Sequence, residues 1–188
     1  DDINGTRARR YGLGLDQKFG GGVFGGVEVS KRDLDSPFVV GQVRDEEQID
    51  EWLGRAYAYW TPRPWLALRA DYLYEEWERT GGLAGRPTEL KTHRLPLGAS
   101  VFLPSGWSAS VTAAYVDQEG VFVQGPGSDT FWVVDLALKY RLPKRYGFVS
   151  AGVRNAGDEQ FSFYDLDTKN PQMLPDRMGF IQITLAFP

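Results

Sequence analysis

Few residues of this chain have the chemistry of a catalytic or metal-binding site. His93 is the only histidine, and the chain has no cysteine. A nucleophilic triad built on His93 would need a serine or cysteine placed beside it, and the sequence shows none. We therefore interpret His93, next to Arg94 at a strand start, as a solvated loop residue, and we expect no enzyme activity. Without cysteine the chain can form neither a disulfide framework nor a thiolate metal site.

The remaining polar motifs are incomplete as binding sites. Asp165, Asp167 and Asn170 have part of the spacing of a calcium loop, but the glycine and the distal glutamate of that motif are missing. The glycines at 20–22 and 25–26 are not followed by a helix, so a tight turn explains them better than a phosphate cradle. A net charge of −4 gives no reason to expect nucleic acid as a partner. No metal and no cofactor is expected.

In several stretches that alternate apolar and polar residues, charged residues recur at every second position. They could select a permeant solute by its charge, or pair with one another and hold a lumen closed, and the sequence leaves both interpretations open. The residues that we expect to face a lumen are Arg69, Asp71, Glu75, Asp135, Lys139, Arg141 and Arg154.

Strict alternation of apolar and polar residues dominates the chain. Clear examples run over 65–75, 107–115, 131–141 and 179–187, with weaker ones near 9–19, 22–32, 51–60, 93–103 and 147–154. A period of two indicates strands with one apolar face. No apolar run approaches the roughly 18 residues of a spanning helix. The sequence therefore predicts an all-β, antiparallel fold of about nine strands and no helix, forming one β-barrel domain or barrel segment over residues 1–188.

Three features favour a transmembrane barrel over a soluble sandwich or lipocalin-like barrel. Aromatic residues cluster at both strand ends, like two interfacial girdles. They are Trp60, Trp65, Trp107, Tyr146 and Phe148 at one end and Tyr72, Tyr74, Trp77, Tyr115 and Trp132 at the other. Short turns near 20–22, 61–64, 104–106 and 143–146 alternate with long polar connections near 33–50, 78–91, 117–129 and 155–178. The charged face of the strands suits a water-filled lumen, because the interior of a soluble barrel is normally apolar.

The last residues resemble the terminal assembly signal of bacterial outer-membrane proteins. Gly179, Ile181, Ile183, Leu185 and Phe187 follow that pattern of a glycine, alternating hydrophobic residues and a closing aromatic, with Pro188 as an extra residue. The resemblance implies contact with the barrel-assembly machinery.

Two further segments resemble larger outer-membrane families. Residues 153–161 and 174–177 are similar to the ends of the last two strands of TonB-dependent receptors, although Ala156 and Gly157 replace that family's Leu and Phe. Residues 58–62 and 92–98 look like barrels appended to periplasmic tetratricopeptide-repeat regions. These resemblances imply the C-terminal part of a barrel in the bacterial outer membrane, in contact with its lipid. The acidic stretch near 33–50 could also bind lipopolysaccharide through divalent cations.

From these features we expect a barrel that takes up or exports a solute. The alternatives are a structural anchor or scaffold for a periplasmic repeat region or envelope complex, and an outer-membrane enzyme, which one histidine disfavours. Nine strands would place the first and last parallel, whereas single-chain bacterial barrels have even strand numbers. We therefore expect an upstream segment or a partner chain to complete the wall.

Overall fold

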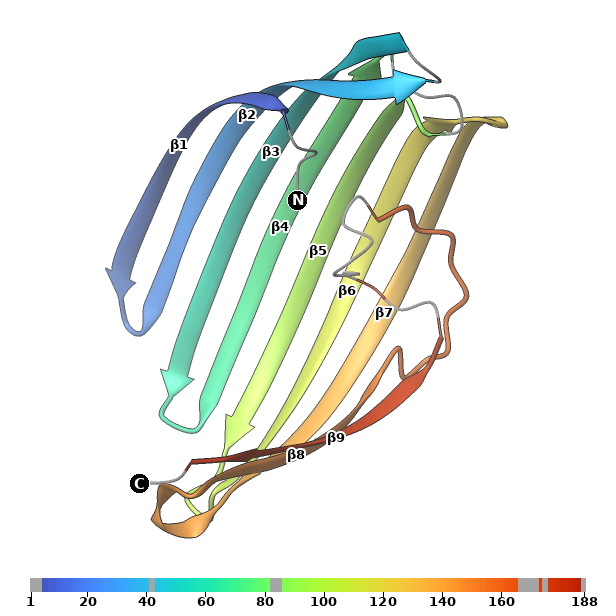
Figure 1. Cartoon of the computed structure of the whole chain (residues 1–188). Coiled ribbons are helices and arrows are strands. Elements are labelled where there is room, and N and C mark those ends of the chain that lie inside the picture. The colour runs from blue at the N-terminus through green and yellow to red at the C-terminus, as the bar shows by residue number, and fades with distance from the viewer. Residues whose placement is uncertain (1–4, 41–42, 82–85, 166–172, 174–175, 187–188) are drawn as a thin grey trace.

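The chain forms one layer of antiparallel β-structure. The computed structural model describes residues 5–40, 43–81, 86–165, 173 and 176–186. Each strand pairs with the next along the chain, in the order β1 to β9 (Figure 1). The strands are β1 Arg7–Gly20, β2 Val23–Val40, β3 Val43–Arg63, β4 Leu66–Thr80, β5 Glu89–Phe102, β6 Trp107–Phe122, β7 Gly125–Arg141, β8 Gly147–Arg154 and β9 Met178–Leu185. A 3-10 turn, Pro143–Arg145, precedes β8.

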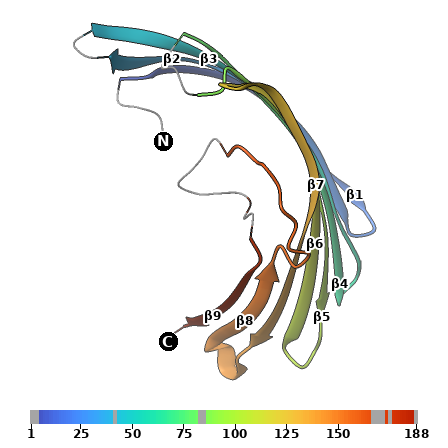
Figure 2. The same ribbon diagram turned by 90° about the vertical axis from the view of Figure 1, so that its right-hand side faces the viewer.

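The sheet curves strongly but does not close on itself. Figure 2 shows it as an arc, with residues 155–165, which follow β8, inside the arc. The two edge strands are β1 and β9 (Figure 1). The predicted all-β antiparallel architecture with about nine strands is confirmed. Closure into a barrel is not seen, because β1 pairs only with β2 and β9 only with β8.

Two of the four predicted long connections are instead mostly strand. β2 and β3 continue to Val40 and from Val43, so most of residues 33–50 pairs in register, with Asp33 opposite Asp50. The predicted connection at 117–129 is likewise mostly the paired ends of β6 and β7. At 78–91 a connection does join β4 to β5, and only residues 78–80 and 89–91 belong to the strands. The charged residues at 33–50 suggest a loop, but backbone pairing does not depend on an apolar side chain, and cross-strand ion pairs such as Lys31 with Asp50 accommodate the charges.

The predicted short turns are confirmed. Gly20, Gly21 and Gly22 all have positive φ between β1 and β2, as a tight turn requires. A Cβ on Gly22 would lie 2.6 Å from the carbonyl oxygen of Thr61, so a side chain has no room there. The glycine run therefore serves the turn. The long connection predicted at 155–178 also joins two strands, β8 and β9.

Alternation gives the sheet two chemically different faces. The concave face carries the buried cluster Val116, Phe131 and Val133, onto which Phe161, Phe163 and Met173 of the β8–β9 connection pack. Cross-strand partners share a face, so the register assigns the other residues to the concave or the convex side. In the parts of the chain that the structure describes, no helix has the length and apolar character to cross a membrane.

Candidate functional site

The convex face carries a continuous apolar belt. Leu136 of β7 lies opposite Val111 of β6 and Val153 of β8, and Val111 lies opposite Ala99 of β5. The belt continues to the sheet edges, where Leu13 is 81% exposed and Ile181 79% exposed. Among the described residues, its other members from β1 to β9 are also uncharged: Leu15, Val27, Val29, Gly54, Ala56, Ala58, Leu68, Ala70, Leu95, Leu97, Ala109, Ala113, Val134, Leu138, Val149, Ala151 and Ile183.

Aromatic side chains bound this belt above and below, and their spacing is the same on three strands. Each of the pairs Trp52 and Trp60 on β3, Trp107 and Tyr115 on β6, and Trp132 and Tyr140 on β7 encloses nine residues, counting both ends. At about 3.4 Å per residue the aromatic pairs are about 27 Å apart along the strand. Across neighbouring strands Trp107 packs on Tyr140, and Tyr115 packs on Trp132. The upper girdle is the set with Trp52, Tyr115 and Trp132, and the lower girdle is the set with Trp60, Trp107 and Tyr140.

From β3 to β7, the position of each aromatic girdle shifts along the strands relative to the residues that are paired in the sheet register. Trp60 is level in the ladder with Leu136, four residues before Tyr140 of the same girdle on β7. At the other girdle, Trp52 is level with Ser128, four residues before Trp132. A slip of four residues over four strands about 4.8 Å apart corresponds to a strand tilt of about 35°. The belt is then about 22 Å high, close to the roughly 25 Å apolar band of outer-membrane barrels.

Not all of the predicted girdle residues belong to these girdles. Trp77 lies opposite the buried Leu90, and Phe148 lies under the ammonium group of Lys139, so both face the concave side. The prediction was wrong for these two residues because it considered only their position near a strand end. It did not consider which face of the strand carries their side chains.

Charged residues on the convex face begin at the level of the upper girdle, where Lys31 lies opposite Trp52. Lys31 Nζ lies 2.8 Å from Asp33 and 3.2 Å from Asp50, and hydrogen bonding to these carboxylates raises the pKa of Lys31. The same contact with Lys31 lowers the pKa of Asp33. Lys91 pairs with Glu89 and Glu76 in the same way on β4 and β5, with its pKa raised mainly by Glu89.

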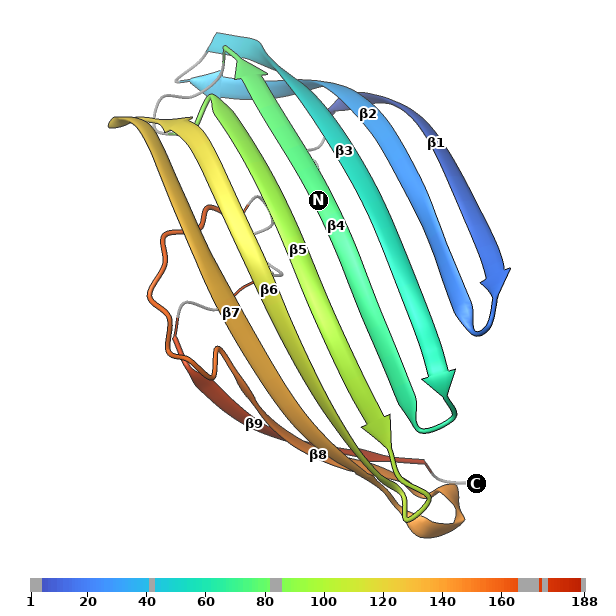
Figure 3. The same ribbon diagram turned by 180° about the vertical axis from the view of Figure 1, so that it is seen from behind.

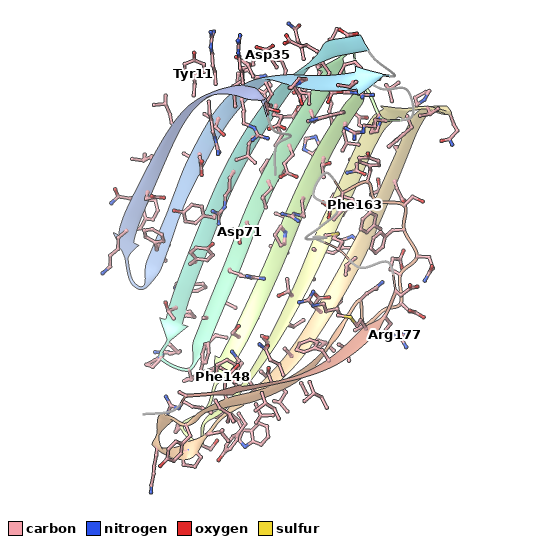
Figure 4. The ribbon with its side chains drawn as sticks, in the orientation of Figure 1. Tyr11, Asp35, Asp71, Phe148, Phe163 and Arg177 are labelled. Carbon is pink, nitrogen blue, oxygen red and sulfur yellow. The ribbon has the colours of Figure 1, made fainter. Side chains whose placement is uncertain are left out.

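All seven predicted lumen residues lie on the concave face. Asp71 accepts a hydrogen bond from Arg55 at 2.9 Å, and Arg69 donates to Thr112 at 3.1 Å. The Lys139 ammonium group is 4.4 Å from the ring centre of Phe148. Glu75, Asp135, Arg141 and Arg154 share this face by register. The structure does not bring the seven together into one cluster, since they extend from β4 to β8. Figure 4 labels Asp71 among the side chains of this face.

The β8–β9 connection is docked inside the concave face by polar contacts that the sequence did not reveal. The Gln118 side-chain amide pairs with the backbone of Tyr164, donating to its carbonyl at 3.1 Å and accepting from its N–H at 2.8 Å. Asp135 accepts from the N–H of Asn155, and Asp129 from the N–H of Ser162. The aromatic ring of Phe161 stacks on Phe131 with centroids 4.2 Å apart. This contact belongs to the apolar cluster of the concave face.

Asn155 holds the start of this connection. Its side chain is fully buried, accepts from the N–H of Glu159 and donates to the carbonyl of the same residue, both at 2.9 Å. Its φ of 47° lies in the left-handed region, which asparagine tolerates better than most residues. Asn155 therefore fixes the tight turn that directs the chain back into the arc.

Replacing Asn155 with alanine should release the connection. We expect a loss of about 1–3 kcal/mol of stability, because two backbone groups lose their partner and alanine disfavours positive φ. Limited proteolysis between 155 and 178 should accelerate in step with this loss. Gln160→Ala, at an exposed position of the same segment, is the control and should leave the cleavage rate unchanged. Equal rates for both variants would contradict this role of Asn155.

His93 is not a loop residue. It lies inside β5 on the convex side, its Nδ1 is 2.7 Å from the Tyr72 hydroxyl, and its ring lies 5.0 Å from that of Tyr74. It therefore belongs to the upper aromatic girdle, and the sequence interpretation was wrong because it began β5 too late. Within the described ranges, no three His, Cys, Asp or Glu residues are grouped to hold a metal ion.

The segment that resembles an assembly signal forms the edge strand β9. Ile181, Ile183 and Leu185 point to the convex side and are exposed, and Gly179 lies opposite Val153. Phe187, the closing aromatic residue, lies outside the described residues, as does most of the acidic stretch 165–170. Comparison of the chain with protein-family models, with curated proteins and with solved structures found no match.

Proposed function

We propose that this chain forms part of the wall of a transmembrane β-barrel in a bacterial outer membrane, and that the barrel lets a solute cross. The observation that carries the proposal is the uncharged convex belt of even height between two aromatic girdles. Lipid would contact this belt, while the charged concave face would line water. Lipopolysaccharide would contact the convex ion pairs beyond the upper girdle.

The exposed belt argues against a soluble sheet. Monomeric soluble proteins rarely expose apolar patches larger than a few hundred Å². Here apolar side chains are exposed on the outer face of strand after strand, including Leu15, Val29, Leu138 and Ile183. Figure 3, which views the sheet from behind, shows none of the described residues covering this side. Lipid would remove this surface from water.

The two sheet edges need partners within such a wall. β1 and β9 run in the same direction, because an antiparallel meander of nine strands returns to its starting direction. An odd number of further strands would close the sheet with antiparallel pairs throughout and satisfy the edge hydrogen bonds. An additional segment of the same polypeptide or a partner chain would supply them.

A structural anchor or scaffold is the second candidate. The docked connection occupies the concave face over β6 and β7, and ion pairs such as Arg55 with Asp71 cross other parts of it. These contacts would suit a wall that conducts nothing. Single-channel recording separates the candidates, since a transport barrel passes ions across a planar bilayer and an anchor does not.

Neighbouring residues on β7 test the membrane assignment directly. The chain has no cysteine, so Leu136→Cys and Ala137→Cys each introduce one unique thiol, on the convex and concave face respectively. With an environment-sensitive fluorophore on each thiol, the label at 136 should be quenched by nitroxide lipids and the label at 137 by aqueous iodide. Quenching of both labels by iodide alone would refute the membrane wall.

Deleting Phe187 and Pro188 should impair insertion far more than any single loop substitution does. The closing aromatic completes the segment that resembles the assembly signal. The amount of folded, heat-modifiable protein in isolated outer membranes measures the effect, and deletion of Pro188 alone is the control. A normal yield of folded protein without Phe187 would show that this segment does not act as an assembly signal.

A further inference from the structure

Residues 155–165 lie against the concave face as a second layer over β6 and β7. Phe161 stacks on Phe131 with ring centres 4.2 Å apart, and Phe163 meets the same ring edge-on at 6.2 Å. Phe131 is buried beneath them. Layers of extended chain that pack face to face through their side chains lie about 10 Å apart. The segment therefore takes up about 10 Å of the space above these two strands.

The wall holds this segment through its backbone. The buried side chain of Gln118 pairs with both backbone groups of Tyr164, as a neighbouring strand would, and also donates to the Thr92 hydroxyl at 2.9 Å. Asp129 accepts from the N–H of Ser162, two residues earlier in the segment. Because these contacts fall on alternate residues, they hold the segment extended and at a fixed place on the wall.

The segment crosses the level of the upper girdle inside the arc. It is bound at its start to Asp135, which lies three residues after the girdle residue Trp132 and inside the belt. Near its end it is bound to Gln118, which lies three residues beyond the girdle residue Tyr115. The second layer therefore extends from within the height of the apolar belt to a level above it.

Large concave side chains on β3 and β4 lie flat against the wall instead. A Cβ on Gly26 would be 2.7 Å from the hydroxyl oxygen of Tyr57, which crosses this glycine to reach Asp16. A Cβ on Gly98 would be 2.6 Å from Nε of Arg69. Side chains that cross a neighbouring strand above a glycine project little from the sheet. The wall is therefore thin at these two places and thick where the segment is docked.

We propose that residues 155–165 narrow the passage along the concave face at the level of the upper girdle and so limit the size of the solutes that cross. Small hydrated solutes would pass beside the segment, and bulkier ones would be excluded. Phe161 and Phe163 act here as positioning residues, since they anchor the segment to the wall. This inference rests on the proposed function, and it names solute size as the property that the docked segment selects.

The reactivity of a thiol on the concave face tests the obstruction in detergent, without any need for conduction. Ala114 of β6 lines a cavity of about 160 Å³ between the sheet and the connection, and Ala114→Cys introduces a unique thiol there. The double variant Phe161→Ala with Phe163→Ala should speed the reaction of this thiol with a bulky polyethylene-glycol maleimide about tenfold or more, because two aromatic contacts that hold the segment are lost.

Two controls accompany this measurement. Ser162→Ala keeps the backbone N–H that Asp129 binds, so it should leave the rate at position 114 unchanged. Glu28→Cys places the thiol on the concave face of β2, away from the segment, and should react at the same rate with or without the two phenylalanines. Equal rates at position 114 in the double variant and in Ser162→Ala would overturn the obstruction.

Single-channel recording in planar bilayers tests the size limit itself. The double alanine variant should raise the conductance about 1.5-fold or more and admit polyethylene glycols that the unaltered chain excludes, since a layer about 10 Å deep leaves the passage. Ser162→Ala should match the unaltered chain. Conductance that appears only in the double variant would also support the constriction.

The outcomes that contradict the two proposals differ. Unchanged conductance and unchanged polymer exclusion in the double variant would overturn the constriction and leave the passage intact. No conductance from any of these proteins would refute the passage and the size limit with it. Gln118→Leu, which removes the pair with Tyr164 from the side of the wall, is the second releasing variant. It decides both experiments if the double alanine variant does not fold.

Discussion

Replacing Val111 with arginine is expected to lower the free energy of unfolding in phosphatidylcholine vesicles by about 2–4 kcal/mol, the cost of a charged side chain at the bilayer midplane. Val111 lies halfway between the girdle residues Trp107 and Tyr115 and faces the convex side. In water, arginine at a position already 39% exposed would cost little. Denaturant titration of the intact protein in vesicles measures the difference.

The control for this experiment is the next residue in the chain. Ser110 has the same depth in the sheet but faces the concave side, opposite Ala137. Ser110→Arg should change the folding free energy by much less than Val111→Arg does. Equal costs for the two substitutions would show that both faces contact the same solvent, and the membrane wall would have to be abandoned.

Replacing Arg79 with methionine should cost about 3–5 kcal/mol of stability, because it leaves a buried carboxylate without its main partner. The side chains of Arg79 and Glu47 are 3% and 4% exposed, with Nη1 3.3 Å from Oε2. Arg86 also approaches Glu47, but only to 4.0 Å and from an exposed position, so it compensates little. Urea unfolding of the vesicle-inserted protein gives the loss.

The double variant Glu47→Gln with Arg79→Met separates the ion pair from packing. It removes both charges and keeps similar side-chain volumes, so most of the lost stability should return. A double variant as unstable as Arg79→Met alone would mean that the arginine acts through its packing on Trp77, whose ring centre lies 5.9 Å from the guanidinium group.

Alternation along the chain was sufficient to predict the strands and their faces. It placed the seven charged candidates on one face, and the register of the sheet gives the same division, with Leu68, Val111, Leu136 and Ile183 on the opposite face. Residue type predicts a face well here because the two faces differ so strongly in polarity. The lumen itself stays a prediction, since the sheet is open.

The strand ends and the docked connection were not predictable in the same way. Beyond the upper girdle both faces carry charges, as at Asp33 and Arg32, so the period of two disappears although pairing continues. The connection is held by Gln118, Asp129 and Asp135 through backbone groups of residues far along the chain. Such contacts leave no pattern in a single sequence, because any residue except proline offers the same N–H.

The slip of the girdles against the ladder restricts how a wall of this kind can grow. Residues that are level in the ladder share a face, so the girdle can step only by an even number of residues without turning its aromatic side chains inward. It descends four residues from β3 to β7, which is two residues for every hairpin. A gene that lengthened this sheet by duplicating hairpins would keep every aromatic ring at the lipid surface. Insertion of a single strand would interrupt either the antiparallel order of the strands or the regular shift of the girdle that corresponds to the strand tilt.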